Sequence, residues 1–172
     1  MTSPEPSGAR VAAALQPLRV LFVLALLAYP ALYLLFRFFA WIVPDAGSST
    51  LASRSVGAGF TDLFLMALPL VAVLIATLTG PVLPGARLFS LIALAEYAFA
   101  LFFGVLAYLI GLGMLEYIGV FDYLVLTLAR LGLITLAGFT VLRIFIALGG
   151  KLTVPAALRT PEAPQAPQAP QA

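Results

Sequence analysis

The chain contains neither cysteine nor histidine, and these two absences exclude much protein chemistry. Without cysteine there are no disulfides, no thiolate metal sites and no thiol redox reactions. Without histidine there is no imidazole ligand for zinc or haem and no imidazole proton carrier. Catalysis by a Ser/His or Cys/His pair within the chain is therefore excluded. The sequence implies no cofactor and no metal site.

Charged residues are also scarce, at 9% of the chain, whereas 63% of it is hydrophobic. Soluble domains are roughly one quarter charged and about half apolar. Because no soluble fold of 172 residues could bury so much apolar surface, the solvent around this chain must be lipid. The net charge of +2, without a dense basic tract, excludes a nucleic-acid partner and leaves membrane lipids as the expected surroundings.

Long apolar stretches predict an all-α membrane protein with four transmembrane helices in an up-down bundle over residues 17–150. The expected spans are residues 18–43, 60–79, 87–112 and 121–148. We expect disordered tails at 1–16, which is polar and small, and at 151–172, which repeats Ala-Pro-Gln. Pro30 and Pro69 should bend the first and second spans.

The charges divide between the two ends of the predicted bundle. The end that carries both termini holds most basic residues: Arg10, Arg19, Arg87, Lys151 and Arg159. The opposite end holds the acidic residues Asp45, Asp62, Glu116 and Asp122. The positive-inside rule then places both termini in the cytoplasm. We expect a multi-pass protein of the plasma membrane, which in bacteria is the cytoplasmic membrane.

Small residues form a stripe along the third predicted span. Ala100, Gly104, Ala107 and Gly111 recur every three or four residues, so on a helix they share one face. Such stripes let membrane helices approach each other closely. Gly132 lies on a comparable face of the fourth span. We predict that these five residues pack helices together, either within the chain or in a homodimer.

Glu96 lies on the same stripe, about 13 Å into its span at 1.5 Å per residue. Arg143 lies about 9 Å from the corresponding end of the fourth span by the same rise. An arginine side chain can cover that difference, so we hypothesise an ion pair between Glu96 and Arg143 that fixes helix register. The alternative is that Glu96 carries a proton or recognises a cation.

Three further charged residues are candidates for contacts in or near the membrane. Arg130 should pair with an acidic residue of the chain, snorkel towards water, or receive an anionic headgroup or an acidic residue of a partner subunit. Its candidate partners are Asp62, Asp122 and Glu116. Asp62 lies in the first turn of the second span, where a negative charge stabilises a helix N-terminus. Arg37 can snorkel outward or pair with Asp62 or Asp45.

The stretches GFTDLFLMALPLVAVLIATLTG, LIALAEYAFALFFGVL and LGGKLTVP resemble parts of small four-span integral membrane proteins of actinobacteria. The likeness covers roughly residues 17 to 155 and leaves out both tails. It implies the plasma membrane of a Gram-positive bacterium, and it brings no catalytic residues.

Two classes of function fit these observations. We favour a non-enzymatic accessory or membrane-organising subunit, as a homo-oligomer or within a larger membrane complex. The alternative is a transporter or channel component that uses Glu96 as an intramembrane ion or proton site. The few polar groups at mid-depth in the first two spans disfavour that alternative. An intramembrane enzyme is disfavoured by the lack of His, Cys and paired carboxylates.

Overall fold

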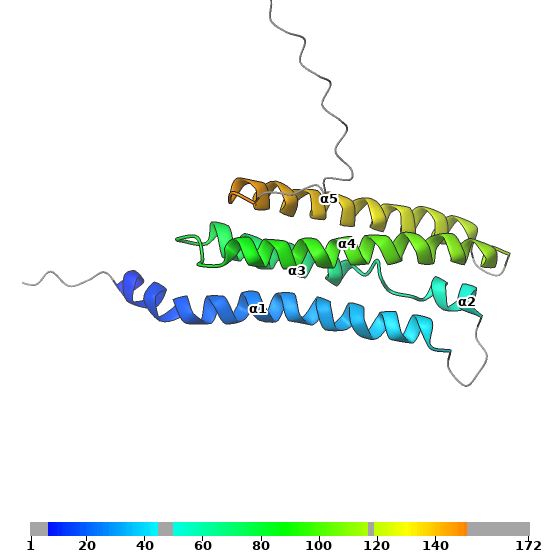
Figure 1. Ribbon diagram of the computed structural model, residues 1–172, viewed down its shortest axis with the longest axis horizontal. Helices are drawn as coiled ribbons and strands as arrows, with labels where there is room; N and C mark the ends of the chain where they lie inside the picture. Colours follow the sequence, from blue (N-terminus) through cyan, green and yellow to red (C-terminus); the bar gives the residue numbers. More distant parts are fainter. Residues whose placement is uncertain (1–6, 45–49, 117–118, 151–172) are drawn as a thin grey trace, which may run out of the picture.

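The computed structural model describes residues 7–44, 50–116 and 119–150, and the side chains of these residues from Pro17 onward except that of Asp122. All regular structure in these ranges is helical (Figure 1). The α-helices are α1 (Ser7–Ile42), α2 (Leu51–Val56), α3 (Leu63–Leu78), α4 (Ala86–Gly111) and α5 (Thr127–Ala147). A 3-10 turn, η1 (Leu112–Met114), follows α4, and a π-helical segment, η2 (Asp122–Leu126), precedes α5.

Three segments are long and apolar enough to cross a membrane: Pro17–Ile42, Ala86–Met114 and Tyr123–Ala147. The fourth apolar helix, α3, has 16 residues. Many large side chains on the outside of these helices are hydrophobic, as at Phe36, which is 70% exposed. Such a surface suits lipid and would aggregate in water. The protein is therefore a multi-pass helical membrane protein.

Helix α4 is the central element, because it contacts α1, α2, α3 and α5. Helix α1 begins and α5 ends at the same end of the bundle, which we call the terminal end (Figure 1). Helix α2 lies at the opposite end, which we call the loop end. A buried stripe runs along α4 between its neighbours and includes all the small residues expected there: Ala93, Ala100, Gly104, Ala107 and Gly111.

Two glycines of this stripe lie where no larger residue fits without movement. A Cβ at Gly104 would lie 3.1 Å from Thr61 and 3.2 Å from Leu131, which is tight. A Cβ at Gly111 would overlap the hydroxyl of Tyr123. Gly132 differs from the expectation, since it is exposed on α5 and no other residue lies within 4 Å of its Cβ position. It therefore packs against no described helix of this chain.

The second predicted span, residues 60–79, corresponds to α3, which begins three residues later and ends one residue earlier. Helix α3 is about 24 Å long at 1.5 Å per residue, shorter than the roughly 30 Å hydrocarbon core. Residues 57–62 are irregular, and α2 precedes them where a loop over 44–59 was expected. Gly59 has a φ of 73°, and Asp62 caps α3 by accepting a hydrogen bond from Phe64 N at 2.9 Å. These two residues prevent α3 from beginning earlier in the chain than Leu63.

The first helix is longer than the expected span. It begins at Ser7, so residues 7–16 are helical where we expected a disordered tail. The alanines within this segment are strong helix formers, which accounts for the extension. Pro30 in α1 and Pro69 in α3 both lie inside helices and are buried against neighbouring helices. The expected tails at 1–6 and 151–172 lie outside the described residues.

Arginine side chains cap the ends of two helices from neighbouring elements. Arg19 of α1 donates hydrogen bonds to the Ile75 carbonyl from Nε at 3.1 Å and Nη2 at 2.7 Å. It also donates to the Pro81 carbonyl at 3.1 Å. Arg54 of α2 donates to the Ile42 carbonyl at 3.1 Å. The Ile75 and Ile42 carbonyls lie in the last turns of α3 and α1, where carbonyl groups lack helical partners, and the Ile75 carbonyl also accepts from Thr79 Oγ1 at 2.7 Å.

Replacing Gly111 by alanine should destabilise the bundle, because the new methyl group collides with Tyr123. Overpacking of this kind costs about 1–3 kcal/mol. We expect a lower midpoint of thermal unfolding in mild detergent. The matched control is Gly132→Ala, which fills open space and should leave the midpoint unchanged or slightly raised. Equal midpoints for the two variants would contradict the close contact at Gly111.

Candidate functional site

Glu96 is a buried acid in the middle of α4, and it has no partner in the described chain. It is 7% exposed, and neither carboxylate oxygen has a hydrogen-bond donor there. It follows Ala86 by ten residues, which places it about 15 Å along the helix. Its neighbour Tyr97 is also buried, but the Tyr97 hydroxyl donates to the Met66 carbonyl on α3. The polar group of Tyr97 is therefore satisfied, whereas that of Glu96 is not.

The Glu96 side chain lines an open groove between α1 and α4, with a volume of about 330 Å³. The other residues that line this groove are apolar: Ala31, Leu34, Leu35, Ile92, Ala95 and Phe99. None of their side chains can donate a hydrogen bond. The groove is thus an apolar surface with a single carboxyl group, and we call it the α1–α4 groove.

The expected ion pair between Glu96 and Arg143 is not formed. Arg143 is exposed on α5, and Glu96 has no donor within hydrogen-bond distance in the described part of the chain. The prediction was wrong because it assigned the face of the fourth span that carries Arg143 to the interior of the bundle. The face of α5 that is buried consists of Leu131, Ile134, Ala137, Val141 and Phe145. Arg143 falls outside that face.

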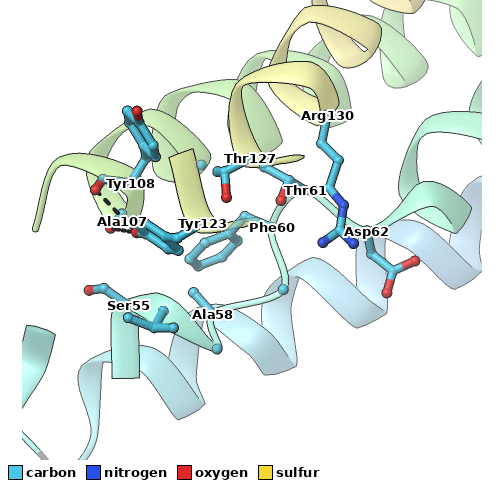
Figure 2. A pocket seen from close by; sticks show the side chains of 14 residues that line it. Ser55, Ala58, Phe60, Thr61, Asp62, Ala107, Tyr108, Tyr123, Thr127 and Arg130 are labelled. Atoms are coloured by element: carbon cyan, nitrogen blue, oxygen red, sulfur yellow. Dashed lines mark hydrogen bonds between the residues drawn. The ribbon is translucent and has the colours of Figure 1, made fainter. Parts of the chain in front are cut away.

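A second polar site lies at the loop end, beside the N-terminus of α3 (Figure 2). It is a cavity of about 200 Å³ between α2, residues 57–62, α4 and the start of α5. We call it the loop-end cavity. Its polar lining includes Thr61, Asp62, Thr127 and Arg130, and the Asp62 carboxylate points away from the Arg130 guanidinium (Figure 2). Irregular backbone at membrane depth is tolerated where it lines such a cavity or is buried in protein.

Asp62 and Arg130 place opposite charges in this cavity. One carboxylate oxygen of Asp62 accepts the capping hydrogen bond from Phe64 N. The Arg130 guanidinium extends from α5 towards Asp62 (Figure 2). No nitrogen and oxygen of the two groups come within 4.0 Å, and no ion pair forms among the side chains that the structure describes. The predicted pairing of Arg130 with Asp62 is therefore absent, although the two residues do meet at one site.

Tyr123 forms the part of the cavity wall nearest the loop end. Its hydroxyl donates to the carbonyls of Ala107, at 3.4 Å, and Tyr108, at 3.2 Å. Its ring stacks on that of Tyr108 with centroids 5.7 Å apart. Tyr123 belongs to the π-helical segment η2, and such segments often occur at functional sites. The sequence analysis missed this residue, because a π-helical turn has no signature in an apolar run.

An aromatic cluster supports the cavity from the side of α1. Trp41 is buried, and its indole nitrogen donates to Ser55 Oγ on α2 at 2.8 Å. The ring of Trp41 packs edge-on against Phe60 and Phe103. Trp41 thereby joins α1 to α2. Thr50 caps α2, since its Oγ1 accepts a hydrogen bond from the backbone N–H of Ser53 at 3.2 Å. A threonine of this kind is the sequence signal from which the start of α2 could have been predicted.

Arg37 takes no part in either site. It is exposed on α1, where its Nε donates to the Tyr33 hydroxyl at 3.0 Å and its guanidinium lies 5.1 Å from the centre of that ring. In the described ranges it forms no ion pair with Asp62. The Tyr33 ring thus holds the Arg37 guanidinium by a cation–π contact, and snorkelling of Arg37 towards water stays a prediction.

No protein-family model, no curated protein and no solved structure matches this chain. What the fold and the helix lengths define is a class, the multi-pass helical membrane proteins. Any more specific function has to follow from the α1–α4 groove and the loop-end cavity.

If Glu96 has no partner in the isolated chain, replacing it by leucine should raise stability. A buried polar group without a partner costs about 1–3 kcal/mol, which the substitution removes. We expect Glu96→Leu to increase the midpoint of thermal unfolding in detergent. Arg143→Gln should change it little, and a double-mutant cycle of the two should show coupling near zero. A coupling energy of more than about 1 kcal/mol would show that the two side chains interact and would support the predicted ion pair.

Proposed function

We propose that this protein is a non-enzymatic accessory subunit that binds a transmembrane helix of another membrane protein in the α1–α4 groove. The observation that carries the proposal is the carboxyl group of Glu96, which is buried near the middle of α4 without a hydrogen-bond donor from the described chain. Acidic residues at the centre of a membrane helix are unfavourable by about 2.5–3.5 kcal/mol. A partner that supplies a donor would recover part of this free energy.

The lining of the groove indicates the chemistry of that partner. Six of its seven lining residues are apolar, which suits the packing of a lipid-embedded helix. The seventh, Glu96, calls for one donor at matching depth, such as Lys, Arg, Ser or Thr. A second copy of this chain fits less well, because a symmetric contact would place two Glu96 carboxyl groups together. We therefore favour a different protein as the occupant.

The second candidate is a transporter or channel component in which Glu96 binds a proton or cation. The same buried carboxyl group supports it, since ionisable residues inside membranes often mark transport paths. A path needs further polar groups aligned with the acid. The groove supplies none besides Glu96, which makes this candidate the weaker one.

The proposed topology has four crossings with both termini in the cytoplasm. The second crossing would consist of α3 together with residues 57–62 and α2, which lie at the loop end of the bundle (Figure 1). Arg19 and Arg87 lie at the terminal end, which supports a cytoplasmic location for that end by the positive-inside rule. The resemblance to actinobacterial four-span proteins supports the cytoplasmic membrane of a bacterium as the location.

A photo-crosslinking amino acid in the groove tests the subunit proposal. Placed at Ala95 in cells of the native host, it should capture a transmembrane segment of another protein with a hydrogen-bond donor at the depth of Glu96. Glu96→Leu should abolish that crosslink while the chain stays folded. The control position is Ala98, which is exposed on the same helix but outside the groove lining. It should not give this product.

Two outcomes would contradict the subunit proposal. Capture of lipid alone, or of a second copy of this chain, would show that the groove does not bind a different membrane protein. Proton or cation flux in liposomes containing only this protein, abolished by Glu96→Gln, would favour the transport candidate. Flux that is equal in the wild type and in Glu96→Gln, or absent from both, would reject transport through Glu96.

A reporter pair fused to the chain tests the topology. Alkaline phosphatase, which is active only outside the cytoplasm, should be inactive after Ala172 and active when inserted next to Thr50. Green fluorescent protein should give the opposite pattern. Phosphatase activity after Ala172 would mean that the positive-inside assignment is inverted.

A further inference from the structure

We propose that the loop-end cavity binds the zwitterionic headgroup of a phospholipid, with the phosphate at Arg130 and the ammonium at Asp62. This site is separate from the α1–α4 groove and independent of the subunit proposal. The cavity has a volume of about 200 Å³, which is roughly that of seven water molecules at about 30 Å³ each. It is therefore large enough for a small headgroup and too small for a peptide.

The phosphate position follows from the groups at one side of the cavity. Arg130 presents a planar guanidinium that can donate two parallel hydrogen bonds to phosphate oxygens. The hydroxyl groups of Thr127 and Thr61 line the same cavity and can donate as well. The N-terminus of α3, which begins at Leu63, adds a positive dipole end beside them.

The ammonium position follows from Asp62. Its carboxylate uses one oxygen to cap α3, so acceptor capacity remains on the other oxygen. A purely anionic ligand placed at Arg130 would be repelled by this carboxylate. A ligand that carries a phosphate and an ammonium a few bonds apart would satisfy both charges. The structure itself leaves them more than 4.0 Å apart.

The surface of α5 around Arg130 favours a lipid over a free solute. Leu126 and Leu133 lie one turn before and after Arg130, on the same side of the helix. They are 51% and 45% exposed. Acyl chains can lie along these leucines while the phosphate reaches the guanidinium. A free phosphoethanolamine would gain nothing from this apolar flank.

The experiment uses the full chain reconstituted in vesicles with equal amounts of phosphatidylethanolamine and phosphatidylglycerol. Lipid retained after mild detergent extraction is counted by native mass spectrometry. We expect the wild type to retain phosphatidylethanolamine about tenfold over phosphatidylglycerol, the effect of one charge-assisted hydrogen bond. Arg130→Gln should lower retention of both lipids. Asp62→Asn, which preserves the helix cap, should remove the preference. Arg143→Gln is the matched control on the same helix.

Several results would overturn the proposal. Equal retention of the two lipids by the wild type, or unchanged retention in Arg130→Gln, would show that the cavity does not select a zwitterion. Displacement of the bound lipid by soluble phosphoethanolamine would assign the site to a free solute. If Arg130→Gln does not fold, Arg130→Lys keeps the charge but loses the paired donors, and undiminished retention in that variant would equally refute the guanidinium contact.

Discussion

Backbone N–H and carbonyl groups that are removed from water must find partners, and this constraint shapes the segment at the start of α3. Helix α3 begins at Leu63 and is shorter than the hydrocarbon thickness, and irregular backbone precedes it. The chain shields this segment with Gly104, whose lack of a side chain admits Phe60 and Thr61 against α4. The cavity beside Thr61 is the space that this irregular segment leaves. The position of the polar site therefore follows from the end of a helix.

The central position of α4 has a second consequence. Its small-residue stripe is covered by helices on several sides, yet the stripe also contains Glu96. Tyr97, one residue on, reaches a backbone carbonyl of α3, but Glu96 turns towards the α1–α4 groove and finds only apolar side chains. A bundle selected for stability alone would hold a leucine there. This unpaired acid is the observation on which the proposed partner helix rests.

The three long apolar spans were predicted within about two residues, because an apolar run of that length is the signature of a membrane helix. The sequence also predicted the stripe on α4, since periodicity alone defines it. It failed at α5, where Leu131 and Val141 rather than Gly132 and Arg143 face the neighbours. In a helix that is apolar on all sides, the inward face is chosen by packing with other helices, and no hydrophobic contrast along the chain records that choice.

The α1–α4 groove and the loop-end cavity differ in their unpaired polar and charged groups, and this difference determines which ligand each can bind. The groove has one acceptor in an apolar setting, so its ligand must bring a single donor on an otherwise apolar body, as a membrane helix does. The cavity has a cation and an anion, so its ligand must bring both charges within a small volume, as a zwitterionic headgroup does.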